Sequence, residues 1–564
     1  MEGPAARDPL HARVAGLLER AFNPIMVKEV RASLRGSRFF IAHLVILSLF
    51  AAGLLIIFAV MMSTSGRYYT DNYGQGFPGD PARVGRQVYM ITQLIHLGVV
   101  FVVVPGLAAS ALTSEREALT YELLLSTTLT ARQIVWGKFT AAMTQTFTIF
   151  VSMIPLVGLC FLFGGITVYQ ILANYVFLFG LSALMVMFAL SISASSRTTQ
   201  RAVGSVYGMA LLMGFFMVGA GIVAVEGREA FPRAMAMAYG FLSPGPEGGF
   251  GEVGAFQRVM YVHVIPGFAW AALFAIFFLN AVNRLKPLYA NRSTALRVYY
   301  AVVATAAAAL AIVTIYMEGP AGTMDVDSRR VLVIVYTISL LTTVLLSALF
   351  ACEDPILPPA LAAEVAALRG FRRALQFLWP GSRSGSVFCL LVNGLLIALS
   401  FAAFLPYTDG FNDGAWVRLH RIFPLALAFI TVLLWAYFCT MLARWLATVL
   451  AGRPVLLRSI LIITCLFLVI FPIVHWAISH AIDPDPLDPG RRHGPATLGL
   501  SPVAAILSAL DLEPRHRTFP LLAMGIPIPG LFAFFALAGG TAFLVLAERA
   551  HARLRAQSLG APGA

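Results

Sequence analysis

The stretch SEREALTYELLLSTTLTARQIVWGK, Ser114–Lys138, decides the fold because it is polar and lies between two long apolar runs. The runs Val88–Leu112 and Phe139–Leu162 each contain enough residues to cross roughly 30 Å of hydrocarbon as a helix. A polar stretch this short cannot form a domain of its own. It therefore predicts a connection at one membrane surface between two spanning helices.

The composition of the whole chain is that of a membrane protein. Of 564 residues, 59% are hydrophobic and only 12% are charged, and the mean hydropathy is +0.81. Apolar runs long enough to span predict about twelve transmembrane helices. These runs are Phe39–Met62, Val88–Leu112, Phe139–Leu162, Tyr169–Ser193, Gly204–Val225, His263–Asn283, Val298–Met317, Val331–Ala351, Val387–Pro406, Ile422–Ala443, Ser459–Ala481 and Ile526–Ala547.

The charge distribution predicts which membrane side holds the termini. An even number of spans places both termini on one side, and most of the 40 Lys and Arg residues fall in the segments on that side. Cytoplasmic segments carry such an excess, so the net charge of +13 reflects membrane orientation and indicates no nucleic-acid partner. The predicted fold is an all-α, polytopic helix bundle of two six-helix halves, with both termini cytoplasmic.

The halves resemble degenerate copies of each other. Leu-Ser-Pro occurs at Leu242–Pro244 and at Leu500–Pro502, and Ile-Pro-Gly begins at Ile265 and at Ile528. Their similar offsets suggest a parallel repeat, as in several transporter families. The predicted domains are residues 1–38, a cytoplasmic N-terminus with an interfacial helix; 39–290, a six-span domain; and 291–564, a second six-span bundle.

The stretch NPIMVKEVRASLRGSRFF predicts an interfacial helix before the first span. Asparagine suits the N-cap and proline suits the first helical position, while basic residues recur at spacings of three and four. Such a helix lies flat on an anionic leaflet, and a plain juxtamembrane anchor would show the same pattern. The candidate residues are Asn23, Pro24, Lys28, Glu29, Arg31 and Arg35.

The opening stretch itself predicts two short helices. Ser114 with Glu117, and Thr130 with Gln133, each match a capping box. A solvated loop would also fit this pattern. A helix lying on anionic lipid favours Lys and Arg, whereas this segment contains three Glu and one Arg between Ser114 and Leu125. The acidic residues therefore favour a protein partner.

Catalytic and metal-binding patterns are absent from the sequence. Gly137-Lys138 lacks the first glycine and the hydroxyl residue of a phosphate-binding loop, and no hydrolase or metalloprotease motif occurs. The five cysteines form no C-x-x-C pair. We expect no enzymatic activity, metal or bound cofactor in this chain. The spans lack Asp, Glu, Lys and Arg away from their ends, which disfavours a proton-coupled carrier.

In the stretch NPIMVKEVRASLRGSRFF and in the opening stretch Ser114–Lys138, the sequence resembles the permease subunits of type-2 ATP-binding-cassette (ABC) exporters. The resemblance covers roughly Asn23 to Arg284 and is most specific in the opening stretch. Thr128 departs from it, since proline is usual there. The residues that match, together with Leu125 beside them, are the candidate ATPase-coupling residues: Glu115, Arg116, Glu117, Thr120, Glu122, Leu123, Leu124, Leu125, Leu129, Ile134, Gly137 and Lys138.

The resemblance implies a mechanism and partners. Residues 113–138 would be a coupling loop bound to a separate ATPase, in two copies, that holds ATP and Mg, and the interfacial helix would be an elbow in the inner membrane of a bacterium. The chain would form the export pathway, either as a homodimer or as one six-plus-six unit. A twelve-span secondary carrier and a membrane scaffold without a transport cycle share this topology. The apolar spans select no substrate.

Overall fold

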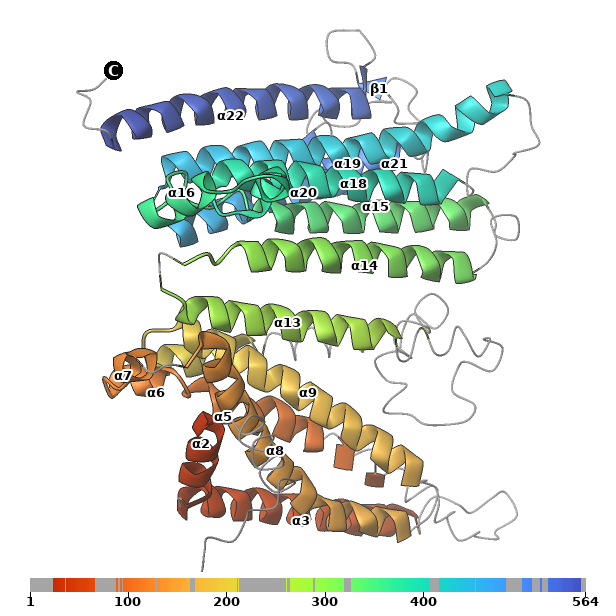
Figure 1. The fold of residues 1–564 in the computed structure, drawn as a ribbon. Coiled ribbons are helices and arrows are strands. Elements are labelled where there is room, and N and C mark those ends of the chain that lie inside the picture. The colour runs from red at the N-terminus through yellow and green to blue at the C-terminus, as the bar shows by residue number, and fades with distance from the viewer. Residues whose placement is uncertain are drawn as a thin grey trace, which may run out of the picture. The chain divides into compact units, whose positions relative to one another are not determined.

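The computed structural model describes two compact helical units, Met1–Pro287 and Leu288–Ala564. We refer to them as the first and the second unit; the helices of both are drawn in Figure 1. The residues whose structure is described are 24–35, 37–65, 88–89, 92–93, 95–126, 129–162, 168–209, 211, 260, 264–287, 290–318, 326–405, 415–451, 453–482, 500–509, 518–519 and 526–558.

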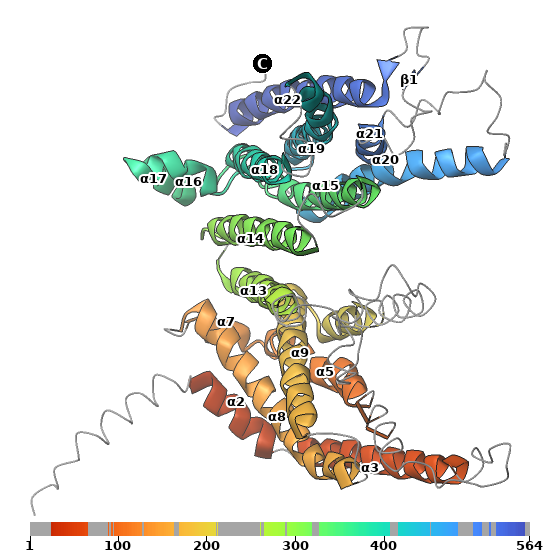
Figure 2. The same cartoon turned by 90° about the vertical axis from the view of Figure 1, so that its right-hand side faces the viewer.

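Helices are the regular secondary structure of the first unit among its described residues. Its labelled elements are α2 (Pro24–Arg35), α3 (Ser37–Ser65), the π-helix η1 (Val99–Val103), α5 (Val104–Ala109), α6 (Thr113–Glu117), α7 (Tyr121–Ser126), α8 (Ala131–Leu162), α9 (Val168–Ser195) and α13 (Ile265–Leu285). A further helix occupies residues 199–209. Figure 2 shows α2 beside α8, and α9 packs against α5, α8 and α13.

Apolar side chains form both the interior and part of the surface of the first unit. Met153, Met187 and Leu190 belong to a buried cluster that joins η1, α5, α8, α9 and α13. By contrast, Phe40 and Leu44 on α3 are more than half exposed. Apolar side chains this exposed would be costly in water and are stable in hydrocarbon, which fits a membrane-embedded helix.

Polar side chains within the predicted spans pair across helices. Asn174 on α9 donates to the side-chain oxygen of Gln93, and His96 lies within hydrogen-bonding distance of Thr92 O (2.8 Å) and Tyr175 Oη (3.2 Å). Gln93, His96 and Asn174 are all buried. These polar groups therefore join neighbouring helices within the predicted spans.

The second unit contains helices and one minimal pair of strands among its described residues. Its elements are α14 (Thr294–Glu318), α15 (Val326–Ala348), α16 (Pro359–Ala366), α17 (Phe371–Ala374), the 3-10 helix η3 (Leu375–Leu378), α18 (Ser382–Phe404), α19 (Ala415–Val449), α20 (Pro454–Ile482), α21 (Pro502–Ala509), β1 (Thr518–Phe519), β2 (Ile526–Pro527) and α22 (Ile528–Ser558). The strands are antiparallel, with Thr518 opposite Pro527.

Helix α19 forms the centre of the second unit. It packs against α15, α18, α20, α21 and α22, and its Trp435 is 1% exposed and stacks on Phe438. The start of α14 and the end of α22 lie at the same end of this unit (Figure 1). Loop helices α16 and α17 lie beside α18, away from α19 and α22 (Figure 2).

The structure confirms the helical fold class. Seven stretches of the described residues are long and apolar enough to cross a membrane, among them Ile95–Glu117, Asn174–Ser195 and Leu425–Val449. Both α13 and α22 begin at an Ile-Pro-Gly motif. The total of about twelve spans, and the side on which the termini lie, stay predictions.

Candidate functional site

Lys138 joins three elements at the base of the candidate coupling segment, residues 113–138. Its Nζ lies 2.8 Å from Glu115 Oε1 in α6 and 3.1 Å from Glu29 Oε1 in α2. The Lys138 side chain is 3% exposed, against 17% for Glu115 and 33% for Glu29. Because the ammonium is buried, the carboxylates supply the hydrogen bonds that water cannot. The predicted elbow, coupling loop and third span therefore share one ionic contact.

Arg116 joins the same segment to the end of α9. Its Nη2 donates to the carbonyl of Ala194 at 2.9 Å, and its Nη1 donates to the carbonyl of Ser196. The last carbonyls of a helix lack partners within the helix, and a cation there is favoured by the helix dipole. Arg116 therefore caps α9 and holds α6 against it.

Glu117 makes the matching contact with the start of the next helix, residues 199–209. Its carboxylate accepts from the Thr199 backbone N–H at 2.7 Å and from the Thr199 hydroxyl at 2.8 Å. The backbone N–H, followed by the hydroxyl, holds the pKa of the Glu117 carboxyl below its ordinary value. Ser193 Oγ accepts from the backbone N–H of Leu112 at 3.1 Å. Residues 112–117 are therefore hydrogen-bonded along their length to the segment from Ser193 to Thr199.

A left-handed turn follows α6 and turns the chain outward. Leu119 N donates to Arg116 O at 3.2 Å, and Thr120 N donates to Glu115 O at 3.0 Å. These two bonds form a Schellman motif, in which glycine is usual at the left-handed position. Leucine occupies it here, with φ of 57°. A left-handed backbone at a residue other than glycine costs about 1–2 kcal/mol of stability. The presence of leucine here therefore suggests a role for its side chain.

The outer part of the segment is exposed. Leu119 is 84% exposed and Leu123 is 68% exposed, and Thr120 and Glu122 are exposed between them. Exposed leucines on a segment braced by charged contacts form a surface that is suited to a protein partner.

The structure confirms one predicted capping box and contradicts the other. Thr130 N donates to Gln133 Oε1 at 2.8 Å, and Gln133 N donates to Thr130 Oγ1 at 3.3 Å, so α8 begins with reciprocal caps. Ser114 caps nothing, because α6 begins at Thr113 and Ser114 N already donates to Ser110 O. Glu117 binds Thr199 instead of the start of its own helix.

The remaining candidate coupling residues divide between interior and surface. Ile134 and Gly137 are buried and Leu129 is half-buried, so these residues position α8. The side chains of Leu124 and Leu125 lie outside the described residues, as does Thr128. Sequence reasoning did not assign Ser193, Ala194, Ser196 and Thr199 as contacts. The signal available was the Ser- and Thr-rich stretch that ends the fourth apolar run.

Pro24 begins α2, as its fixed φ predicts. Lys28 and Arg31 are exposed on α2, and Glu29 contacts Lys138. Asn23 and the side chain of Arg35 lie outside the described residues. The prediction of an interfacial helix here is consistent with this arrangement, and its position relative to a bilayer stays a prediction.

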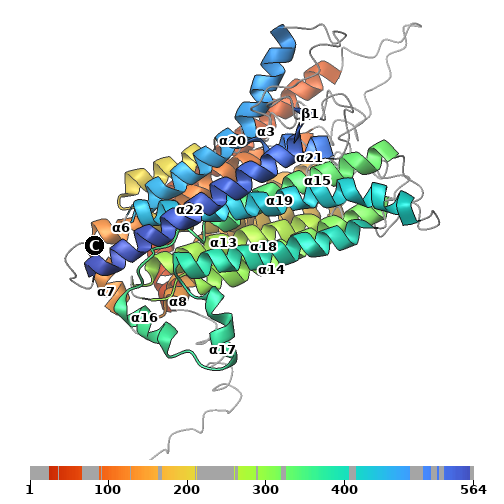
Figure 3. The same cartoon turned by 90° about the horizontal axis from the view of Figure 1, so that it is seen from above.

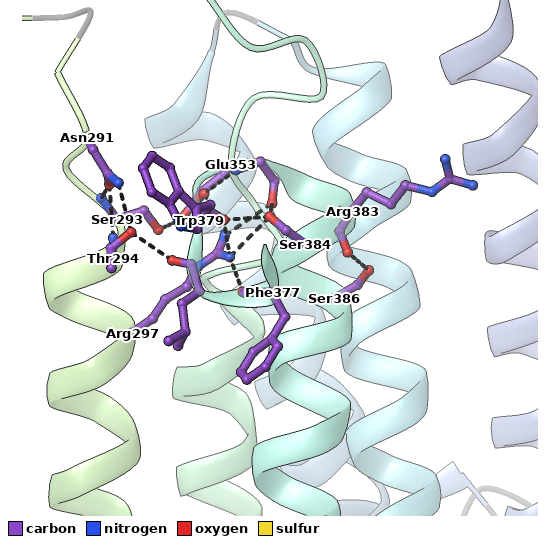
Figure 4. A network of polar contacts seen from close by, with 12 residues as sticks. Asn291, Ser293, Thr294, Arg297, Glu353, Phe377, Trp379, Arg383, Ser384 and Ser386 are labelled. Carbon is purple, nitrogen blue, oxygen red and sulfur yellow. Dashed lines mark hydrogen bonds and ion pairs between the residues drawn. The ribbon is translucent and has the colours of Figure 1, made fainter. Parts of the chain in front are cut away.

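The second unit has a separate buried ion pair, which sequence reasoning missed. Arg297 Nη2 lies 2.7 Å from Glu353 Oε2, and the Arg297 side chain is 0% exposed (Figure 4). Glu353 also accepts from Gly381 N at 2.7 Å and from the Ser293 hydroxyl. Arg297 Nη1 donates to Phe377 O at 2.7 Å. The loop between α15 and α18 is therefore held at both ends by α14.

Close helix packing reinforces this ion pair. A Cβ at Gly385 in α18 would lie 2.1 Å from Phe350 O and 3.0 Å from Arg297 Nη2. Only glycine allows the backbones to approach this closely. Glu548 of α22 also contacts Arg444 of α19, which fastens two more helices at the same end.

Apolar helices with long-range polar contacts at their ends define an integral, multi-pass membrane protein. Residues 24–246 match the family model described as ABC-2 family transporter protein, and this match supports an ABC-2 type permease that spans the membrane. Permeases of this family generally work with an ATPase subunit. The matched residues lie within the first unit. Searches of curated proteins and of solved structures found no match.

Proposed function

We propose that this chain is the permease subunit of an ABC exporter and that residues 113–138 couple it to a separate ATPase. The observation that carries the proposal is the exposure of Leu119, Glu122 and Leu123 on a segment that Lys138 and Arg116 hold in place. An exposed apolar surface on a firmly held base is suited to transmit a force from a bound partner.

The contacts of the segment lead into the membrane by two routes. Movement of α6 would act through Glu115 and Lys138 on α8, and through Arg116 on the end of α9. Since α8 has 32 residues and α9 has 28, each continues far from the contact. Closure of two ATPase copies around ATP and Mg would thus move the helices that form the pathway, while this chain performs no catalysis.

The family match supports the permease assignment, and the direction of transport, the bacterial inner membrane and the ATPase partner are parts of the proposal. A single-chain unit is favoured over a homodimer because the chain contains two compact units of similar length. The second unit would then be the degenerate permease half. A secondary carrier and a scaffold are the alternatives that the experiment separates.

The test is retention of an ABC ATPase during mild purification of the full chain from native membranes. Glu122→Arg reverses an exposed charge within the proposed surface, and Glu364→Arg makes the same change on α16 as a matched control. We expect the wild type and the control to retain the ATPase and Glu122→Arg to lose it. A properly folded wild type that retains no ATPase contradicts the proposal. Ion-gradient-dependent transport would then indicate a carrier, and its absence a scaffold.

A further inference from the structure

The loop between α15 and α18 carries an exposed basic tip in the second unit. We call Leu368–Leu375 the basic tip. It contains Arg369, Arg372 and Arg373, all exposed, and Phe371, which is 79% exposed. Among the described residues, none forms an ion pair with these three arginines. Their charges are therefore available to an external partner.

The base of this loop is firmly held although its tip is exposed. Arg297, which is fully buried, donates to the carbonyls of Phe377 and Gly381, and Glu353 accepts from Gly381 N (Figure 4). Within the tip, the chain turns at Gly370, whose φ of 57° is a conformation that favours glycine. A fixed base and a glycine turn give the basic tip a defined place beside the ends of α14 and α18 (Figure 3).

The residues directly after the tip lie where two spanning helices begin. Both Thr294–Thr314 and Ser382–Phe404 are apolar enough to cross a membrane, and the loop accepts a hydrogen bond from the first turn of each, at Leu378 O from Thr294 and at Trp379 O from Ser384. A loop tied to the ends of spanning helices lies at the level of the lipid headgroups. Arginines with an aromatic residue at that depth are typical of segments that bind anionic lipid.

The charge of the tip selects lipid over a protein partner. From Val365 to Arg383 the chain contains four arginines and no acidic residue. The coupling segment of the first unit differs, since its exposed Leu119 and Leu123 are accompanied by Glu117 and Glu122. An anionic leaflet complements the basic tip and repels the acidic segment.

We infer that the basic tip of the second unit binds the anionic lipid surface at its own end of the helix bundle, with Phe371 inserted among the acyl chains and the three arginines on lipid phosphates. Each arginine near an anionic surface strengthens binding about fivefold, so the three together favour the bound tip by roughly 100-fold. This inference is independent of whether an ATPase binds the first unit.

The test uses the full chain in nanodiscs of phosphatidylcholine, with or without about one third phosphatidylglycerol. A polarity-sensitive fluorophore is attached at Phe371→Cys, and the wild type treated in the same way gives the background, since its described cysteines are buried. We expect emission at shorter wavelength, and quenching by spin-labelled lipid, only with phosphatidylglycerol. Changing Arg369, Arg372 and Arg373 to Gln in this variant should abolish both effects.

The matched control carries the fluorophore at Leu119→Cys, which is equally exposed but lies on the acidic segment. We expect no effect of phosphatidylglycerol there. A label at residue 371 that stays in water in both lipids overturns the inference. So does insertion that is equal in both lipids or insensitive to the triple change. Protection of the label only when an ATPase is added would show a protein site instead, and would also overturn it.

Discussion

Lys138 Nζ lies 2.8 Å from Glu115 Oε1, which makes a buried ammonium the link between α8 and the segment before it. We expect Lys138→Met to destabilise the first unit by on the order of 3 kcal/mol, because it leaves Glu115 and Glu29 without their cation in a partly buried site. Thermal unfolding in mild detergent measures the loss.

A double change separates the ion pair from simple packing. Lys138→Met combined with Glu115→Gln removes the stranded charge, so we expect it to restore part of the stability lost in the single variant. If the double variant is no more stable than Lys138→Met, the carboxylate is not the source of the loss.

Leu119→Gly separates the backbone role of this position from its side chain. Glycine relieves about 1–2 kcal/mol of left-handed strain, which offsets the 0.5–1 kcal/mol or so of added freedom in the unfolded chain. We therefore expect little change in the unfolding temperature. If residues 113–138 bind an ATPase, its affinity should fall about tenfold or more, as for a central interface side chain.

Leu119→Met is the control, since it keeps an apolar side chain on the same backbone. It should retain the ATPase nearly as well as the wild type in a titrated pull-down. Equal retention by the glycine variant would show that the exposed leucine is not part of the contact.

The difference between the two capping boxes shows what sequence can predict. Thr130 and Gln133 are three residues apart, and both bonds are made within that distance. Ser114 and Glu117 have the same three-residue spacing. Glu117 nevertheless binds Thr199, which is 82 residues away, because α9 returns the chain to this point. Local pattern predicts a contact only when no distant group competes for it.

Contacts between residues far apart in the sequence also could not be predicted for the rest of the site. Apolar run lengths predicted the positions of α8, α9 and α18, since spanning helices must be long and apolar. Lys138 was singled out by its resemblance to a family motif, but its bond to Glu29 crosses 109 residues. A charge pair of this kind has no periodicity, so only the folded chain reveals it.

Glu353→Gln tests the buried ion pair of the second unit. The change leaves the fully buried Arg297 without its counter-charge, so we expect a loss of about 3–5 kcal/mol. Asp354→Asn removes a charge from the neighbouring exposed residue and should change stability by less than about 0.5 kcal/mol. Unfolding of both variants in the same detergent measures the difference in stability. If Glu353→Gln loses no more stability than Asp354→Asn, the buried Arg297 does not depend on the Glu353 carboxylate.

Gly385→Ala and Gly394→Ala compare two glycines of α18. A Cβ at Gly385 meets Phe350 O at 2.1 Å, so backbone shifts should cost about 1–3 kcal/mol. A Cβ at Gly394 has no neighbour within 4 Å, and alanine there should be neutral or stabilise the helix by up to about 1 kcal/mol. The unfolding temperatures should therefore move in different directions, and a shared decrease would count against the close approach at Phe350.

Glu115 and Glu353 each follow the second long apolar helix of their unit, yet the cations that bind them come from different places. Lys138 belongs to α8, the helix after the loop, whereas Arg297 belongs to α14, the first helix of its unit, which lies two long helices before α18. An alignment of the two halves that matches charge with charge would therefore fail at both sites. If the two halves are a degenerate repeat, each has kept an anchored carboxylate while a different helix supplies its counterion, so their relationship should be sought in the order of the helices and not in matching charges.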